Sequence, residues 1–447
     1  MTGKQAPSVL VIAPSAYPLG GVADWLDSVL PGLQALGWRC VLGLVQGRFH
    51  DVNTYLSRHP WQDVRRIANP TGSQPGRIAS ITACLRQVRP DLVVVVNIAA
   101  TYCAIRYLRL RGQPSPKVVM TLHGFQSDLL EDCRASVDVL DGVVSTNRLG
   151  VKMAASNMGS EERVFYAPCG VPVPSGRVAA TTGVAVTQPL RLLYCGRFEQ
   201  EQKRICDLVE LASSLARRGV SCQISLAGAG PDEALLRQAI AARGAERVFR
   251  FLGVLAPTAL SREYRRHDAL IITSVWETGP IVAWEAMSHR LPVISSCFVG
   301  SGLEGALLNG RNCLLFPIGD MAAAADAVAA LMAFGIRERL VTGGLELVQR
   351  RYSRSCSVSL WNDALHQILR LPSLPAPRLP SGALPQGRLD RWLGVKWGER
   401  VRRTLGVSYR HDDAGGEWPH ACHGAQSQNE FLRWAREADG RDGQCGQ

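Results

Sequence analysis

Two glutamates have the spacing that points most directly to chemistry. Glu277 and Glu285 lie in the segment 274–296, which reads SVWETGPIVAWEAMSHRLPVISS. Two carboxylates in a cleft can act as a general acid and a general base, or one of them can accept hydrogen bonds from ribose hydroxyls. The pair alone leaves a second interpretation open, namely a solvent-facing helix that carries two ordinary glutamates.

The elements around these glutamates are predicted to be a strand, a loop, a helix and a second strand. Residues 269–274, ALIITS, and residues 291–296, LPVISS, have the apolar pattern of buried strands. Ligands of open α/β sheets bind at the carboxyl ends of strands, because helix N-termini and free loop amides gather there. We therefore expect both carboxylates to border a ligand-binding loop.

Two cations follow another predicted strand, RLLYCG at 191–196. Arg197 and Lys203 could stabilise the negative charge that develops on a departing diphosphate. The alternative is that they solvate a helix start, where positive charge is mildly unfavourable against the helix dipole. The neighbouring Arg204 leaves open which cation would reach a phosphate.

A glycine pair and a histidine end two further predicted strands. Gly20 and Gly21 would let the backbone approach a phosphate closely after the first strand, although a lone Gly-Gly is more often a turn. His123 ends the run KVVMTLHG at 117–124, with Asp128 as a weaker candidate on the same loop. A histidine there could donate to a bound sugar or assist proton movement, although a lone histidine is usually structural.

Short β-branched runs alternate with helical segments along most of the 447 residues. Continuous apolar strands of this kind indicate parallel sheets covered on both faces. The pattern predicts an α/β domain at 1–180, a second α/β domain at 188–355 and a helix at 356–371. A Pro-rich linker and a basic tail follow at 372–447.

Composition describes an ordinary globular protein with 46% hydrophobic and 20% charged residues. The net charge of +12 suits an anionic partner, which could be nucleic acid, an acidic membrane surface or a phosphorylated ligand. The 13 cysteines show no C-x-x-C pair, which argues against a disulfide framework or a structural zinc site. No apolar run is long enough for a signal-peptide core or a membrane span, so we expect a cytoplasmic protein.

Residues 277–294 resemble the E-x7-E signature of glycosyltransferase family 4, whose members are retaining enzymes with the GT-B fold. Other landmarks of this family appear in its order within residues 8–370. They are GGV at 20–22, TLHG at 121–124, APCGVP at 167–172, CGRFEQEQKR at 195–204 and AGAGP at 227–231. The ordered combination carries the resemblance, and the tail lies outside it.

The resemblance implies GT-B architecture, with two Rossmann-like domains that face a central cleft and a C-terminal extension. The second domain would bind a nucleotide-sugar donor and the first would present the acceptor. The implied catalytic residues, beside the transferred sugar, are His123 and Glu277. The implied donor ligands are Arg197, Lys203, Gly20 and Gly21 at the diphosphate, and Glu285, Gly228 and Gly230 at the ribose and nucleotide.

The donor loop departs from the family pattern. Thr278, Gly279 and Pro280 replace the more usual Gly-Phe-Gly, and Pro280 has no backbone N–H to give to a phosphate. Ile281 and Val282 must then supply the amide donors of this loop. The departure bears on the identity of the donor, which the sequence does not give, more than on the reaction class.

The chain contains no Asp-x-Asp triplet, the motif with which metal-dependent glycosyltransferases of the other major fold hold a divalent ion. Arg197 and Lys203 can serve instead, so we expect no metal requirement. We also expect no cofactor, since the nucleotide-sugar is a substrate.

The tail contains one basic amphipathic stretch, RLDRWLGVKWGERVRRTLG at 388–406. Leu389, Leu393, Trp397, Val401 and Leu405 recur at every fourth position among several arginines. A basic helix that bears Trp can lie on an anionic membrane surface. The alternatives are a helix packed back onto the protein and a disordered basic tail.

The sequence thus predicts a retaining glycosyltransferase with a nucleotide-sugar donor and a glycan or lipid-linked acceptor of the cell envelope. We expect peripheral contact with the inner face of the membrane and no nucleic-acid partner. Two rival functions stay open at this point. They are a sugar-nucleotide epimerase of the same architecture and a non-catalytic binding subunit of a polysaccharide assembly complex.

Overall fold

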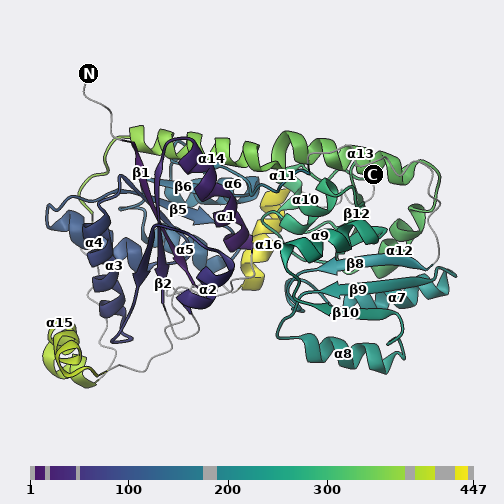
Figure 1. Ribbon diagram of the computed structural model, residues 1–447, viewed down its shortest axis with the longest axis horizontal. Helices are drawn as coiled ribbons and strands as arrows, with labels where there is room; N and C mark the ends of the chain where they lie inside the picture. The colour runs from purple at the N-terminus through teal and green to yellow at the C-terminus, as the bar shows by residue number, and fades with distance from the viewer. Residues whose placement is uncertain are drawn as a thin grey trace. The chain divides into compact units, whose positions relative to one another are not determined.

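The computed structural model describes residues 6–15, 21–46, 51–174, 189–377, 388–407 and 428–440. The chain divides into two compact units, whose elements are labelled in Figure 1. The first unit comprises Met1–Thr146, Gly150–Ala167 and Val358–Phe431, and the second comprises Asn147–Leu149, Pro168–Ser357 and Leu432–Gln447.

Within the described residues, the first unit contains a seven-stranded sheet in the order β3-β2-β1-β4-β5-β6-β7, and all of its pairs are parallel. The strands are β1 (Ser8–Pro14), β2 (Arg39–Val45), β3 (Val64–Ile67), β4 (Leu92–Val95), β5 (Lys117–Leu122), β6 (Gly142–Ser145) and β7 (Val164–Tyr166). Six of them coincide with the apolar runs of the sequence. The strand order reverses between β1 and β4, as in doubly wound folds.

Helices alternate with these strands, as the parallel pairing requires. They are α1 (Gly21–Ala35), α2 (Val52–Arg58), α3 (Gln74–Val88), α4 (Ala100–Leu110), α5 (Ser127–Ala135) and α6 (Arg148–Met158). Helix α3 begins after Ser73, whose hydroxyl accepts a hydrogen bond from the Gly76 amide at 3.0 Å. This N-cap fixes the start of α3.

In the second unit, the described residues form a six-stranded parallel sheet in the order β10-β9-β8-β11-β12-β13. The strands are β8 (Leu190–Cys195), β9 (Cys222–Ala227), β10 (Phe249–Gly253), β11 (Ala269–Ile272), β12 (Val293–Ser296) and β13 (Leu314–Phe316). Each one lies on an apolar run of the sequence. The predicted α/β fold class is therefore confirmed in both units.

The helices of this unit are α7 (Asp207–Arg217), α8 (Glu233–Ala242), α9 (Pro257–Arg266), α10 (Ile281–Ser288), α11 (Ser301–Glu304), α12 (Met321–Ala330) and α13 (Ile336–Leu347). A π-helical turn, η1 (Val348–Tyr352), follows α13 and precedes α14 (Arg354–Arg370). The turn brings the Tyr352 ring parallel to the Trp284 ring of α10, with 4.0 Å between the centroids. This stack anchors α10.

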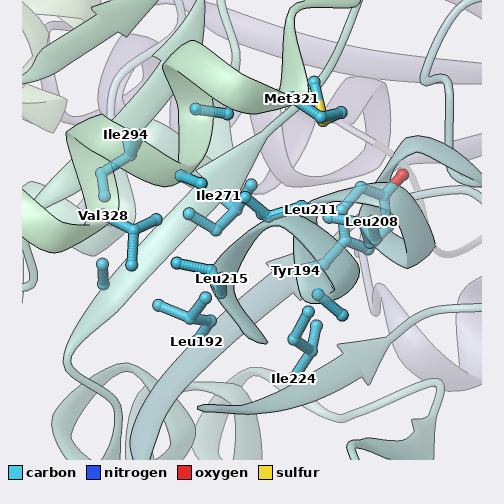
Figure 2. Packing of buried hydrophobic residues seen from close by; sticks show 14 of the residues in the cluster. Leu192, Tyr194, Leu208, Leu211, Leu215, Ile224, Ile271, Ile294, Met321 and Val328 are labelled. Atoms are coloured by element: carbon cyan, nitrogen blue, oxygen red, sulfur yellow. The ribbon is translucent and has the colours of Figure 1, made fainter. Parts of the chain in front are cut away.

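Both faces of the second sheet are buried. Leu192 and Ile271 lie in one apolar cluster with α7 and α12, and Figure 2 shows Leu208, Leu211 and Val328 of these helices around them. The alternate residues Leu193 and Leu270 lie in the other cluster, which includes Trp284 and Met287 of α10. Burial on both faces explains why these strands are mostly apolar. It also fixes the ends of β8 and β11, which border the site described below.

Two helices form in the C-terminal region, α15 (Arg388–Leu405) and α16 (Gln428–Asp439). The first matches the predicted amphipathic stretch, although Gly394 interrupts it with φ 75° and ψ 154°. The second was not predicted. None of the helices in the described ranges combines the length and the apolarity needed to cross a bilayer.

Ten of the described cysteines are free thiols. Burial raises the pKa of several of them, for example to about 12 for Cys40 and Cys133, so these thiols stay protonated. Cys297 differs because it is disulfide-bonded. The cysteine spacing in the sequence did not predict this bond.

Candidate functional site

The centre of the site is an ion pair between Lys203 and Glu277 in the second unit. The Lys203 Nζ lies 2.5 Å from the Glu277 Oε1, and the Ser274 hydroxyl donates to the same oxygen at 2.6 Å. Glu277 is only 7% exposed, which rules out the solvent-facing alternative for this residue. The buried carboxylate is held by one cation and one hydroxyl, as a buried charge requires.

Hydrogen bonds between two loops bring Lys203 and Glu277 together. The loop after β8 carries Lys203, and the loop after β11 carries Glu277. The Thr273 hydroxyl donates to the Lys203 carbonyl at 2.6 Å, and the Val275 amide donates to the Gln202 carbonyl at 2.8 Å. Because β8 and β11 are neighbours in the sheet, their carboxyl ends place both loops at one edge.

The structure also shows different partners for Lys203 and Arg204, whereas the sequence left open which of the two cations would reach a phosphate. Arg204 has a left-handed backbone conformation with φ 49°, so its side chain diverges from that of Lys203. Its guanidinium binds Asp207 at the start of α7 through two contacts of 2.6 and 3.1 Å. Lys203 is therefore the cation that faces Glu277.

Arg197 lies on the same loop but is half exposed. Its Nη2 is 2.5 Å from the Glu199 Oε2 and donates to the Gln202 Oε1 at 3.2 Å. Gln202 in turn donates to the Trp276 carbonyl at 3.0 Å. Arg197 is thus held near the loop that carries Lys203, with its cationic group open to solvent.

Helix α10 starts four residues after Glu277, with Pro280 at its N-cap. The amides of Ile281 and Val282 open the helix, where backbone N–H groups have no carbonyl partner within the helix. Gly279 precedes them with φ 140°, a conformation that favours glycine over the larger residue usual in the family. The predicted donor loop therefore ends on a helix N-terminus, a setting suited to anions.

Glu285 has its own partner. The Tyr264 hydroxyl of α9 donates to the Glu285 Oε2 at 2.8 Å. Tyr264 is buried, and burial, with the nearby Cys195 and Glu285, raises the pKa of its phenol well above the usual value. The phenol is therefore a neutral donor that orients Glu285. Nothing in the sequence around Tyr264, REYRRHD, indicated this role.

Glycines Gly228 and Gly230 have a packing role in the structure. A Cβ at Gly228 would lie 1.9 Å from the Gly196 carbonyl oxygen, and one at Gly230 would lie 2.3 Å from the Phe198 carbonyl oxygen. The loops after β8 and β9 cross so closely that no side chain fits. Their predicted contact with a nucleotide stays a prediction.

Two further predicted residues, His123 and Gly21, lie in the first unit. His123 lies between two indoles, with its ring centroid 4.6 Å from that of Trp25 and 6.4 Å from that of Trp361. Burial lowers the pKa of His123 to about 4, so its imidazole is neutral near pH 7. Gly21 is the first residue of α1, and Gly20 lies outside the described residues.

One carboxylate of the C-terminal helix was missed by the sequence. Asp439 accepts hydrogen bonds from the amides of Gly300, Gly302 and Leu303 at 2.8, 3.0 and 2.8 Å. These amides surround the start of α11, in the second unit. The contact spans more than 130 residues of chain, so no local pattern could have revealed it.

Known proteins resemble this chain in sequence and in fold. Residues 189–333, which include Lys203 and Glu277, match the family described as glycosyl transferases group 1. A phosphatidyl-myo-inositol mannosyltransferase of Mycobacterium leprae is 30% identical over 182 residues, which are 40% of this chain and 45% of that protein. The match thus spans less than half the length of that relative.

Solved structures share the fold over most of the chain. A lipopolysaccharide outer core galactosyltransferase, WaaB, has a TM-score of 0.63 at 18% identity and covers 80% of this chain and 99% of its own. The Anabaena protein HepE, in complex with UDP and glucose, has a TM-score of 0.65 at 18% identity with the same coverage. The resemblance to this family that the motifs predicted is confirmed. The chain has the GT-B fold, and its residues 189–333 match the group 1 glycosyl transferases.

Proposed function

We propose that the protein is a retaining glycosyltransferase that moves a sugar from a nucleotide-sugar to a lipid-linked or polysaccharide acceptor of the cell envelope. The observation that carries the proposal is the buried Lys203–Glu277 pair beside the N-terminus of α10. A sugar diphosphate fits this arrangement, because its phosphate oxygens suit an ammonium group and helix amides while its sugar hydroxyls suit a carboxylate.

The reaction breaks the bond between the anomeric carbon and a diphosphate oxygen. The oxygen of an acceptor hydroxyl forms a new bond to the anomeric carbon on the same face, and its proton passes to the leaving diphosphate. Negative charge grows on the diphosphate during this step. Lys203, Arg197 and the first amides of α10 would bind that charge more strongly in the transition state than before it.

Of the two roles expected for His123, hydrogen bonding to the transferred sugar has the better support. The low pKa of its imidazole, about 4, makes it a weak base. Protonating it at the site would cost about 3 kcal/mol more than protonating a histidine in water. A neutral imidazole can still donate one hydrogen bond to a sugar hydroxyl without carrying charge.

The identity of the substrates is proposed from the named relatives. One is named as a transferase to phosphatidyl-myo-inositol and another acts on the outer core of lipopolysaccharide. Both names support a membrane-linked glycan as acceptor. HepE is known with UDP and glucose, so UDP-sugars are the first donors to test. With a membrane-linked acceptor, the protein would work in the cytoplasm at the inner face of the membrane.

We further propose that transfer needs no metal ion. The diphosphate would be neutralised by Lys203, by the exposed guanidinium of Arg197 and by the α10 N-terminus. Activity that is unchanged by EDTA would support this statement, and activity that is lost in EDTA and restored by a divalent ion would contradict it.

The test is a donor panel followed by a transfer assay. UDP-, GDP- and ADP-sugars are screened by thermal shift, where a ligand at 100 times its dissociation constant stabilises by about 2.7 kcal/mol. The donor that binds is then incubated with lipid-linked and polysaccharide acceptors, and the product is identified by mass. We expect Lys203→Met and Glu277→Gln to remove transfer while the protein stays folded.

A matched control is the exposed pair of Glu233 and Arg237, 2.7 Å apart on α8. Glu233→Gln and Arg237→Met should transfer at the wild-type rate. Near-wild-type turnover by the Lys203 and Glu277 variants would refute the site. A sugar that changes while its nucleotide stays attached would indicate an epimerase, and donor binding without any turnover would indicate a binding subunit.

A further inference from the structure

Helix α15 packs with its ionic side inward. Asp390, Glu399 and Arg402 are its buried charged residues, each less than 10% exposed. The helix lies beside α3 of the first unit (Figure 1). Glu399 accepts hydrogen bonds from the hydroxyls of Thr71 and Ser73, at 2.7 and 2.5 Å, just before α3 begins.

The buried charges of α15 satisfy one another. Arg402 lies 2.6 Å from the Asp390 Oδ1 and 3.5 Å from the Glu399 Oε2. Gly398 completes this contact, because a Cβ there would lie 2.3 Å from the Asp390 Oδ1. The hydrogen bonds of Glu399 with Thr71 and Ser73 therefore join α15 to the rest of the first unit, while the ion pairs of Arg402 lie within the helix.

Several apolar residues of α15 are exposed. Trp392 is 87% exposed and Trp397 is 58% exposed, Leu393 and Leu405 are also exposed, and so is Val407, just after the helix ends. Single exposed apolar residues are ordinary in proteins, but a group of them on one element marks a contact surface. We call Trp392, Leu393, Trp397, Leu405 and Val407 the outer ridge.

The charge beside the outer ridge has one sign. Five exposed basic residues accompany it, namely Arg388, Arg391, Lys396, Arg400 and Arg403. Both acidic residues of α15, Asp390 and Glu399, are buried, and Glu399 reaches Arg403 at 3.2 Å. The Arg400 guanidinium lies 5.5 Å from the Trp397 ring centroid. The outward surface of this helix is thus cationic and aromatic, without exposed acidic residues.

We propose that α15 docks the protein on an anionic lipid bilayer, with the outer ridge in the headgroup region and the basic residues on the lipid phosphates. Indole rings favour the membrane interface, and each basic residue near an anionic surface strengthens binding about fivefold. Leu393, Leu405 and Val407 favour lipid over nucleic acid, because aliphatic side chains find no partner along a phosphate backbone.

This docking would hold the enzyme beside a lipid-linked acceptor, and that benefit rests on the proposed function. The binding itself does not, so vesicle binding and sugar transfer can fail separately. The full-length protein is therefore first tested without donor or acceptor. Flotation with phosphatidylcholine vesicles that contain about 30% of the anionic lipid phosphatidylglycerol is compared with flotation with vesicles of phosphatidylcholine alone.

Two variants remove the features that carry the proposal. Trp392→Ala with Trp397→Ala removes the aromatic part, and Arg391→Glu with Arg400→Glu reverses two charges. Each should weaken binding to the anionic vesicles at least tenfold, the second by about 25-fold or more from the loss of two basic residues. Lipids brominated on their acyl chains should quench the fluorescence of the wild-type protein more than that of the double tryptophan variant.

The controls are exposed residues of the second unit with matching chemistry. Phe334→Ala removes a fully exposed aromatic ring, and Arg247→Glu with Arg250→Glu makes the same charge change on another surface. Both should bind vesicles like the wild type. Because all of these side chains are exposed, each variant should melt at the wild-type temperature.

Three results would overturn the proposal. The first is no binding of the wild type to anionic vesicles, and the second is equal loss in the control variants. The third is tighter binding of a duplex or single-stranded DNA oligonucleotide than of vesicles at the same salt, which would assign the surface to nucleic acid.

Discussion

Deleting the ammonium group of Lys203 separates the two roles of the Lys203–Glu277 pair. In Lys203→Met the stem of the side chain remains, while the carboxylate of Glu277 stays in the interior with the Ser274 hydroxyl at 2.6 Å as a remaining partner. Removing one member of a buried ion pair costs about 3–5 kcal/mol, because a charge is left behind. The Lys203 side chain is 21% exposed, so we expect the lower end, about 3 kcal/mol.

The loss is measured as a change in melting temperature. For a domain of about 150–250 residues, 1 kcal/mol corresponds to roughly 2–4 °C, so Lys203→Met should melt roughly 6–12 °C below the wild type. Glu277→Gln leaves the ammonium group without its carboxylate and should also melt lower. Combining the two substitutions leaves no charge behind, so the double variant should recover most of the lost stability.

Transfer activity should stay low in the double variant even though its stability recovers. Loss of one fixed group that stabilises developing charge lowers kcat by about 10²–10³-fold, and the double variant lacks the group just as the single variants do. Stability that recovers without activity would support a role in the reaction. If the double variant regains both, the pair is structural and the proposed mechanism is wrong.

Three further predictions test other parts of the structure. Tyr264→Phe removes the hydroxyl that orients Glu285, so donor affinity in a titration should fall about tenfold with the fold kept, and unchanged affinity would remove Glu285 from the donor site. Gly228→Ala places a methyl group against a backbone carbonyl and should lower the melting temperature severely, whereas Gly219→Ala, which meets nothing within 4 Å, should cost only about 1 kcal/mol of backbone strain. His123 has a pKa near 4 in the folded state, below its value of about 6.5 when unfolded, so the unfolded chain binds the proton first as pH falls. Its contribution to the free energy of unfolding is complete above pH 6.5 and should decline by about 3 kcal/mol between there and pH 4. Chemical denaturation at each pH should show this loss in the wild type and not in His123→Asn. Equal pH dependence of the two proteins would contradict the burial of His123.

Much of the fold follows from the apolar runs of the sequence. Strands β8, β9, β11 and β12 are covered on both faces, so most of their residues are apolar and they stand out from their surroundings. Strand β3, an edge strand, lacks this signal because Arg65 and Arg66 interrupt the run. The other edge strands, β7, β10 and β13, still lie on apolar runs, so β3 is missed because of its two arginines.

The sequence could place the candidate site residues in the fold only where chain position decides it. The ends of β8 and β11 could be located, so Lys203 and Glu277 could be assigned to one sheet edge. The choice between Lys203 and Arg204 could not be made, because it depends on the left-handed backbone at Arg204 and on its contact with Asp207. The role of Tyr264 likewise depends on how α9 packs beside α10, which no sequence spacing records.

Helix α15 shows a different limit of sequence patterns. The apolar repeat at 388–406 predicts a helix with one apolar face, but periodicity does not say which face is turned inward. The direction is decided by particular polar contacts, those of Glu399 with the Thr71 and Ser73 hydroxyls just before α3. Once these contacts hold the ionic face, Trp392 and Trp397 are directed outward. Glu399→Ala should therefore release α15 and increase its amide hydrogen exchange, whereas Trp392→Ala should leave that exchange unchanged; equal exchange in both variants would show that the ionic contacts do not hold the helix.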